Sequence, residues 1–218
     1  MLVIEDLKKH YVDGDKKRNI LKGVDYTFEK GKLYSIAGPS GSGKTTFLSI
    51  IAGLDLQNDG KVLYNNSDIR DIGLDNYRKK DVSIVFQAYN LINYLTALEN
   101  VIIAMEISGD LKDKVNIAKE KLKEVGFDED KMNRVVSKLS GGEQQRVAIA
   151  RSIATNPDIV LADEPTGNLD NSTEKDIIEI FKNLAHKKNK CVIVVTHSNE
   201  LANESDIKIR LKEGKFES

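Results

Sequence analysis

The spacing of apolar residues changes twice along the chain, and these changes predict the order of its strands and helices. The first third contains short apolar runs separated by turn residues, which is typical of strands. Between residues 97 and 154 the apolar positions instead recur every three or four residues, which predicts helices. The runs of the first third are "LVIEDL" (2–7), "VDYTFE" (24–29), "LYSIAG" (33–38), "KVLYN" (61–65) and "VSIVF" (82–86), with a helical pattern at "KTTFLSIIAGL" (44–54).

The last third returns to strands of a different kind. The segments "DIVLAD" (158–163) and "CVIVVT" (191–196) are almost continuously apolar, as in parallel strands that are buried on both faces. The helical pattern "STEKDIIEIFKNLAHK" (172–187) lies between them. This order predicts a βαβ unit and therefore an α/β core that a helical segment interrupts.

Composition narrows the classes of protein without choosing among them. The net charge is −1 and 40% of the residues are apolar, so nothing indicates nucleic acid as the main partner. The apolar runs are shorter than the roughly 20 residues that span a bilayer, so we expect the chain not to cross a membrane by itself. The single cysteine, Cys191, cannot form an internal disulfide, which favours a reducing compartment.

A phosphate-binding loop is the strongest chemical signal in the sequence. The stretch "GPSGSGKTT" matches the pattern G-x-x-x-x-G-K-[ST] and lies between a predicted strand and a predicted helix. Lys44 would neutralise the β- and γ-phosphates, and the Thr45 hydroxyl would bind Mg²⁺. The alternative is a glycine-rich surface turn. The loop consists of Gly38, Pro39, Ser40, Gly41, Ser42, Gly43, Lys44, Thr45 and Thr46.

Polar residues end the predicted strands that neighbour this loop. Asp163 and Glu164 follow "DIVLA", and we expect Asp163 to hold Mg²⁺ and Glu164 to polarise an attacking water. His197 ends the next strand and would contact the γ-phosphate and orient the water. Gln87 ends "VSIVFQ", where its amide oxygen suits Mg²⁺ or the water. The alternative for Asp163 and Glu164 is an acidic helix start or a solvated strand end. For His197 it is a structural histidine, and for Gln87 it is an ordinary loop glutamine.

A second glycine pair needs a separate explanation. In "SKLSGGEQQRVAIAR" (137–151), Ser140 and Glu143 match the capping box of a helix start. Gly141 and Gly142 lie in the first turn, where each glycine costs about 1 kcal/mol relative to alanine. Glycine at a helix start allows an anion to approach the backbone. We therefore expect an anion to approach the backbone at the start of this helix.

Together these motifs resemble those of the ABC-type ATPases. The segments "GPSGSGKT", "VFQ", "LSGGEQQR", "VLADEPTGNLD" and "VVTH" occur in that family's order across nearly the whole chain. The stretches "ADEPTGNLD" and "FQAYNLINYLTALENV" resemble a narrower group. That group includes lipoprotein-release, macrolide-export and antimicrobial-peptide-resistance ATPases and a cell-division ATPase.

The resemblance implies a fold and an arrangement of two chains. It implies a P-loop NTPase (RecA-like) core with an N-terminal antiparallel β subdomain, formed by 1–87 and 156–218, and a helical subdomain at 88–155. Tyr11 would stack on adenine, and Asp170 would lie in the D-loop. The signature Ser140, Gly141 and Gly142 of one copy would close over ATP in the other copy. The implied partners are therefore a second copy and permease subunits on separate chains, at the inner face of the cell membrane.

Three positions depart from the pattern of the group without removing a catalytic group: Ala88, Val136 and Glu143. The leading interpretation is a Mg²⁺-dependent ATPase that drives separate membrane subunits. A regulatory ATPase of a membrane complex, such as one in cell division, is the alternative. A soluble repair or translation ATPase lacks support, because neither a long heptad insertion nor a second cassette is present. The stretch "AYNLINYLT" (88–96) would contact the membrane partner or would only pack between the subdomains.

Overall fold

The computed structural model describes residues 1–14, 16–109 and 112–217, and its centre is a six-stranded sheet. The strand order is β10-β9-β3-β8-β7-β6, in which β9, β3, β8, β7 and β6 run parallel and β10 runs antiparallel to β9. The strands are β3 (Lys32–Ala37), β6 (Val82–Val85), β7 (Ile159–Asp163), β8 (Cys191–Val195), β9 (Ile207–Lys212) and β10 (Lys215–Glu217).

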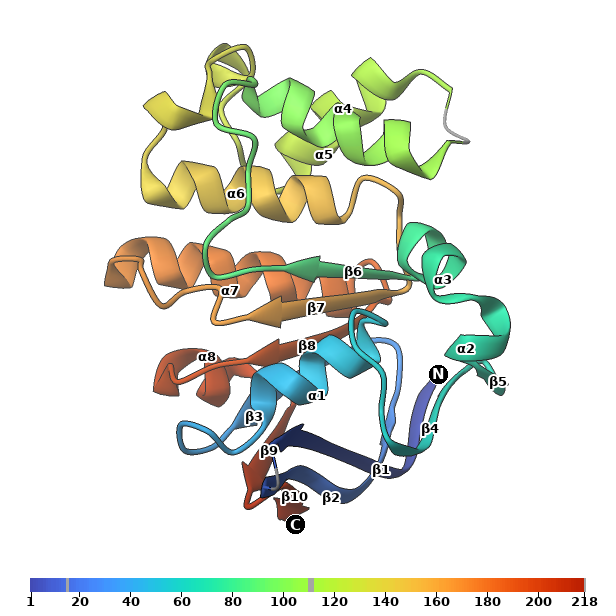
Figure 1. Cartoon of the computed structure of the whole chain (residues 1–218). Helices are drawn as coiled ribbons and strands as arrows, with labels where there is room; N and C mark the ends of the chain where they lie inside the picture. Colours follow the sequence, from blue (N-terminus) through green and yellow to red (C-terminus); the bar gives the residue numbers. More distant parts are fainter. Residues whose placement is uncertain (15, 110–111, 218) are drawn as a thin grey trace.

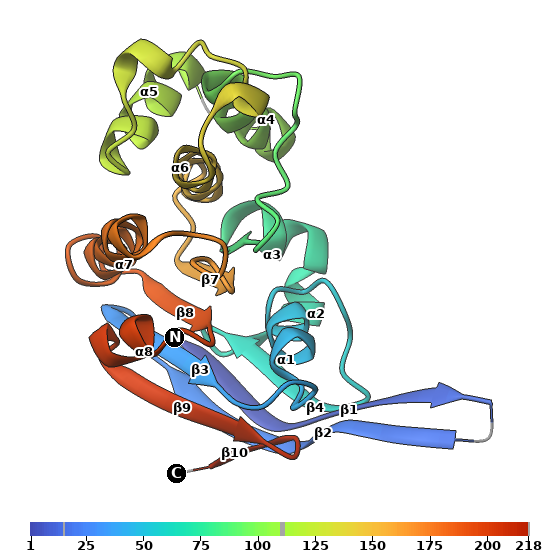
Figure 2. The same ribbon diagram turned by 90° about the vertical axis from the view of Figure 1, so that its left-hand side faces the viewer.

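A second, antiparallel sheet has the order β2-β1-β4-β5. Helix α1 lies between the two sheets, and the β1–β2 hairpin extends beyond the body of the molecule (Figure 2). β-bulges interrupt the register of β1 and β2, and Asp6 adopts a positive φ of 42° there. The strands are β1 (Leu2–Asp13), β2 (Lys16–Phe28), β4 (Asp59–Tyr64) and β5 (Ser67–Asp68).

The helices form two groups. Helices α4, α5 and α6 pack together beyond the β6 edge of the larger sheet, on the side opposite the antiparallel sheet (Figure 1). The remaining helices lie against the strands. The α-helices are α1 (Lys44–Ile51), α2 (Ile69–Ile72), α3 (Leu74–Lys80), α4 (Ala97–Ser108), α5 (Lys114–Glu124), α6 (Gly141–Ser152), α7 (Asn171–His186) and α8 (Asn199–Glu204), with short 3₁₀ turns at Glu129–Lys131 and Val136–Lys138.

Two apolar clusters cover the two faces of the larger sheet. In β7, Val160 and Ala162 face a cluster shared with α7 and the helices α4–α6, whereas Ile159 and Leu161 face a cluster shared with α1 and the antiparallel sheet. Because successive side chains of a strand point to opposite faces, burial on both faces produces a continuous apolar run. The same pattern in β8 explains "CVIVVT".

The expected fold class is confirmed. The βαβ unit β7–α7–β8 has parallel strands, as predicted, and the helical segment lies where the periodicity changes. The first two strands are longer than expected, at 12 and 13 residues. The sequence analysis assigned no element to α2, α3, β5, α8, β9 or β10, which are short or charged. Among the described residues, no helix is both long enough and apolar enough to cross a membrane.

Candidate nucleotide site

One cavity of about 580 Å³ contains most of the predicted phosphate-site residues. The loops that follow β3, β6, β7 and β8 all reach it, because the carboxyl ends of parallel strands meet at one edge of a sheet. Two further residues come from β2, which the sequence analysis did not include. The lining residues are Tyr11, Arg18, Ile20, Ser40, Gly41, Gly43, Lys44, Thr45, Thr46, Gln87, Asp163, Glu164 and His197.

The loop from Gly38 to Gly43 depends on glycine for its path. Gly41 and Gly43 adopt positive φ angles of 74° and 105°, which other residues rarely adopt. A Cβ on Gly38 would lie 2.1 Å from the carbonyl oxygen of Leu211. Helix α1 begins at Lys44, directly after this loop, and no side chain caps it. Its first amide groups therefore stay available to an anion in the cavity.

Two polar groups of the loop have capacity for an anionic ligand. Lys44 is buried, and its Nζ donates to the carbonyl oxygens of Gly38 at 2.8 Å and Pro39 at 3.2 Å. An ammonium carries three protons, so one remains for a ligand. The Ser42 Oγ is buried and has no hydrogen-bond partner among the described residues. A phosphate in the cavity would supply the acceptor that the Lys44 ammonium lacks.

Oxygen ligands of the kind that Mg²⁺ prefers lie in the same cavity. Burial raises the pKa of the Asp163 carboxyl, and the neighbouring Thr45 hydroxyl and Lys44 ammonium partly offset this effect. Gln87, two residues after the end of β6, contributes an amide oxygen to the cavity. A carboxylate, a hydroxyl and an amide around phosphate oxygens fit a magnesium ion. The sequence assignment of Thr45, Gln87 and Asp163 to the metal stays a prediction.

Glu164 and His197 form a pair at the edge of the cavity. The Glu164 Oε2 accepts a hydrogen bond of 2.9 Å from the backbone N–H of His197. The His197 Nε2 lies 3.4 Å from the other carboxylate oxygen. Glu164 also has a positive φ of 47°, a conformation that is uncommon for residues other than glycine. The pair can hold a water molecule and accept its proton.

Tyr11 lines the same cavity, and two neighbouring side chains contact it. Its hydroxyl donates to Asp55 Oδ2 at 2.9 Å, and the Lys9 ammonium lies 4.8 Å from the ring centroid. Burial and the Asp55 carboxylate raise the pKa of the phenol. The ring is still 46% exposed. This fixed and accessible ring suits the stacking role that the resemblance implied.

The signature residues lie outside this cavity. Ser140, Gly141 and Gly142 begin α6, and the predicted capping box is present. The Ser140 Oγ accepts from Glu143 N at 3.3 Å, and Glu143 Oε2 accepts from Ser140 N at 2.8 Å. Lys131, whose ammonium lies 2.7 Å from Glu143, lowers the pKa of that carboxyl. Ser140 and Gly141 are exposed, so α6 presents a capped, accessible amide end.

Asp170 also lies outside the cavity, at the start of α7. Its carboxylate accepts hydrogen bonds from the backbone and hydroxyl groups of Ser172 and Thr173. These bonds hold the pKa of Asp170 far below its usual range. Within a single chain, the role of Asp170 is therefore to cap the start of α7.

Contacts within the chain explain both signature glycines. A Cβ on Gly141 would lie 3.1 Å from the Tyr89 hydroxyl, and one on Gly142 would lie 2.4 Å from the Thr173 methyl. The sequence analysis attributed these glycines to an arriving phosphate alone, and that explanation is incomplete. An added methyl group would overlap the Thr173 methyl at Gly142 and would crowd the Tyr89 hydroxyl at Gly141, so the packing of α6 favours small residues at both positions.

Gly142→Ala is expected to lower the free energy of unfolding by about 1 kcal/mol or more, because overpacking outweighs the gain in helix propensity. The Thr173 methyl cannot rotate away easily, since its Oγ1 donates to Asp170 at 2.7 Å. Thr173→Ser removes that methyl and keeps the hydroxyl. In the Thr173→Ser background, Gly142→Ala should be neutral or stabilising in urea unfolding. An equal cost in both backgrounds would contradict the contact.

An arginine links α6 to the segment that follows Gln87. Arg151 donates to the carbonyl oxygens of Tyr89, at 2.8 Å, and Asn90. Tyr89 and Asn90 both adopt positive φ angles, of 58° and 50°. The guanidinium therefore stabilises an unfavourable backbone conformation beside Gln87. This contact could not be predicted from the sequence, because it joins residues about 60 positions apart.

Comparison with known proteins agrees with this geometry. A family model described as "ABC transporter" matches residues 21–167. The chain is 50% identical over 203 residues to the uncharacterised ABC transporter ATP-binding protein YclH of Bacillus subtilis, covering 93% of this chain and 90% of that protein. It is 41% identical to the lipoprotein-releasing system ATP-binding protein LolD of Rickettsia prowazekii, covering 98% and 96%. A dimeric, post-hydrolysis structure of the ATP-binding cassette MJ0796, bound to ADP and Pi, superposes with a TM-score of 0.90 at 39% identity, covering 100% and 97%.

Proposed function

Because this chain belongs to the ABC transporter family, we propose that two copies of it close around two ATP molecules and thereby drive separate permease subunits. The chain is an ATP-binding cassette with ATPase activity, as its family and the ADP- and Pi-bound neighbour indicate. The division into a core (1–87 and 156–218) and a helical subdomain (88–155) is part of the proposal. The packing of α4, α5 and α6 against one another supports it.

The position of α6 is the observation that carries the proposal. Its capped N-terminus is exposed, and its residues are absent from the lining of the nucleotide cavity. The Ser140 hydroxyl accepts from Glu143 N and still has a proton to donate. An anion can reach this helix end only if another molecule brings it. ATP held in the cavity of a second copy meets that requirement.

Within each cavity the residues divide the work of hydrolysis. The Lys44 ammonium and the amides of the loop bind phosphate oxygens. Glu164 accepts the proton of the attacking water, and His197 holds the water and the Glu164 carboxylate in place. Thr45, Gln87 and Asp163 would hold Mg²⁺, which when bound neutralises charge on the phosphates. Tyr11 carries the adenine ring.

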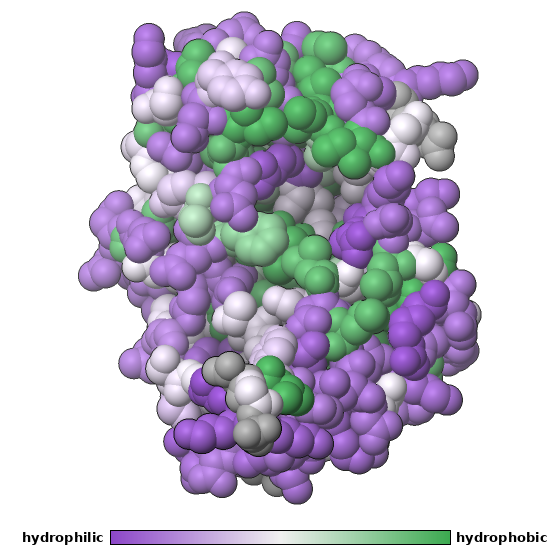
Figure 3. Space-filling view, viewed as in Figure 1, coloured by the Kyte–Doolittle hydropathy of each residue, from purple (hydrophilic) through white to green (hydrophobic). Residues whose placement is uncertain are grey.

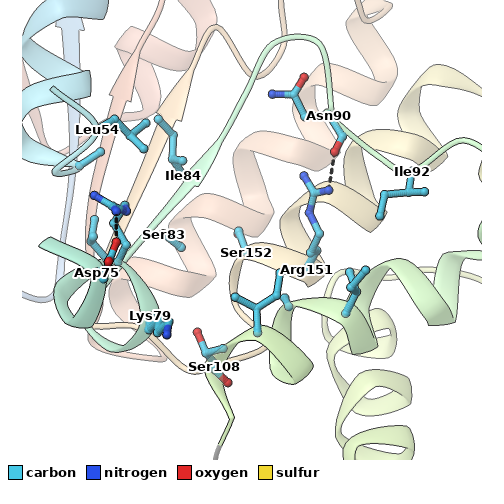
Figure 4. Close-up of a pocket in the computed structure, with 17 residues that line it drawn as sticks. Leu54, Asp75, Lys79, Ser83, Ile84, Asn90, Ile92, Ser108, Arg151 and Ser152 are labelled. Atoms are coloured by element: carbon cyan, nitrogen blue, oxygen red, sulfur yellow. Dashed lines mark hydrogen bonds and ion pairs between the residues drawn. The ribbon is translucent and has the colours of Figure 1, made fainter.

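A groove near Gln87 is the surface that we assign to the permease. It has a volume of about 580 Å³ and lies between α3, β6 and α4. Figure 3 shows apolar side chains gathered at this waist of the molecule, and Figure 4 shows Ile84, Ile92 and Leu54 around it. Asn90 and Arg151 also line it, so the groove adjoins the segment after Gln87. A bound segment could therefore be sensed at the nucleotide.

The occupant that we propose is a cytoplasmic segment of the permease. Two exposed apolar side chains belong to this region. Ile107 lines the groove and is 65% exposed, and Tyr94, two residues after the groove residue Ile92, is 80% exposed. The stretch 88–96 takes part only through Asn90 and Ile92, which line the groove.

Ile107→Asp is expected to abolish co-purification with the permease subunits from detergent-solubilised membranes, while ATPase activity of the isolated chain changes less than about twofold. An aspartate would place a charge in an apolar contact. Val115→Asp is the matched control, because Val115 is 48% exposed on α5 and does not line the groove. Retention of the permease by the Ile107→Asp variant in detergent would contradict the assignment.

This function places the chain at the inner face of the cell membrane, held there by its permease. Cargo is chosen by the membrane chains, so lipoprotein release, export and antimicrobial-peptide resistance all fit this ATPase. A regulatory ATPase of a membrane complex would use the same chemistry. The similarity to LolD favours the transport role.

A further inference from the structure

Arg18 lies on the nucleotide side of the β1–β2 hairpin. Its Cα pairs directly with that of Tyr11 across the two antiparallel strands. Directly opposed residues project to the same face of a sheet, so Arg18 stands beside the ring that we assign to adenine. Both side chains line the nucleotide cavity. The hairpin that carries them reaches out past the phosphate loop (Figure 2).

The guanidinium also reaches the phosphate loop. Its Nη2 lies 3.8 Å from the point where a Cβ on Gly41 would stand. Gly41 is exposed, and among the described residues outside its own chain neighbours, Arg18 alone comes within 4 Å of this point. Arg18 therefore lies between Tyr11, which we assign to adenine, and the phosphate loop.

The charged residues that line the cavity indicate what Arg18 does there. Its described lining contains two carboxylates, Asp163 and Glu164, and two full-time cations, Lys44 and Arg18. Arg18 therefore supplies a positive charge from outside the phosphate loop, in addition to that of Lys44. A guanidinium matches phosphate oxygens with two parallel hydrogen bonds and cannot lose its proton at neutral pH.

We propose that Arg18 is a second cationic ligand of the nucleotide and binds the phosphate chain of ATP from the hairpin side. The proposal rests on the nucleotide site described above. It adds a contact that lies outside the phosphate-loop motif, on a strand that no motif covers. Lys44 holds the phosphates from within the loop, and Arg18 binds them from the hairpin.

The test is the affinity of the purified chain for a fluorescent ATP analogue, MANT-ATP, and for MANT-ADP. Arg18→Ala should weaken the binding of MANT-ATP by about tenfold or more, as expected for charge-assisted hydrogen bonds, and Arg18→Lys should lose less. Lys17→Ala is the matched control, because Lys17 is the next residue on the strand and lines a different hollow with Lys8 and Lys22. It should bind like wild type.

Salt separates a phosphate contact from a structural effect. The ratio of the Arg18→Ala and wild-type dissociation constants should fall between 50 and 500 mM NaCl, because salt screens exposed charges. A ratio that does not change with salt, or affinity equal to that of Lys17→Ala, would overturn the role of Arg18. Lys44→Ala separates a failure of the Arg18 contact from a failure of the nucleotide site itself. If it binds MANT-ATP as wild type does, the nucleotide site itself is wrong.

Discussion

Glu164→Gln is expected to bind ATP, to hydrolyse it roughly 10²- to 10⁴-fold more slowly, and to accumulate as a dimer. The amide keeps the size and the hydrogen bond from the His197 backbone, which is 2.9 Å long in the wild type. It cannot accept a proton from water. ATP therefore stays intact between the two copies, and the closed state persists because hydrolysis no longer weakens it.

The measurement combines ATP turnover with size-exclusion chromatography in the presence of ATP. Glu120→Gln is the control. It makes the same chemical change at a residue that is exposed on α5 and lies away from the cavity. It should hydrolyse ATP and elute as wild type does. A Glu164→Gln variant that hydrolyses ATP at the wild-type rate would remove Glu164 from the reaction. One that stays monomeric at saturating ATP would contradict the shared site.

The strand-end residues of the site could be predicted from the sequence because topology brings them together. Asp163 and His197 follow apolar runs that can only be neighbouring buried strands, and the phosphate loop follows a third. Parallel strands end at one edge, so spacing along the chain becomes proximity in space. The capping box at Ser140 was equally predictable, since it depends on four consecutive residues.

Residues brought in by long-range packing were not predictable. Arg18 enters the cavity only through the register of a hairpin with bulges, and nothing local indicates that register. The contacts of Gly141 with Tyr89 and of Gly142 with Thr173 join separate elements. The groove depends on how α4 lies against α3, and α3 has too few apolar residues to be seen in the sequence.

The second large effect concerns the two halves of the site. Lys44→Ala removes the phosphate-binding ammonium but leaves α6 intact, and alone it should lose ATP binding and hydrolysis. Ser140→Arg leaves the cavity intact but fills the approach to α6 with a bulky cation and removes its cap, at a cost of about 1 kcal/mol in helix stability. Alone, it should bind ATP and fail to hydrolyse it.

A mixture of the two inactive variants is the most direct test of a site shared between copies. In a mixed dimer, the intact cavity of the Ser140→Arg chain faces the intact α6 of the Lys44→Ala chain, so one complete site forms. ATPase activity should therefore appear on mixing, although neither variant hydrolyses ATP alone. Native mass spectrometry would confirm that mixed dimers form. Mixed dimers without any ATPase activity would contradict the shared site.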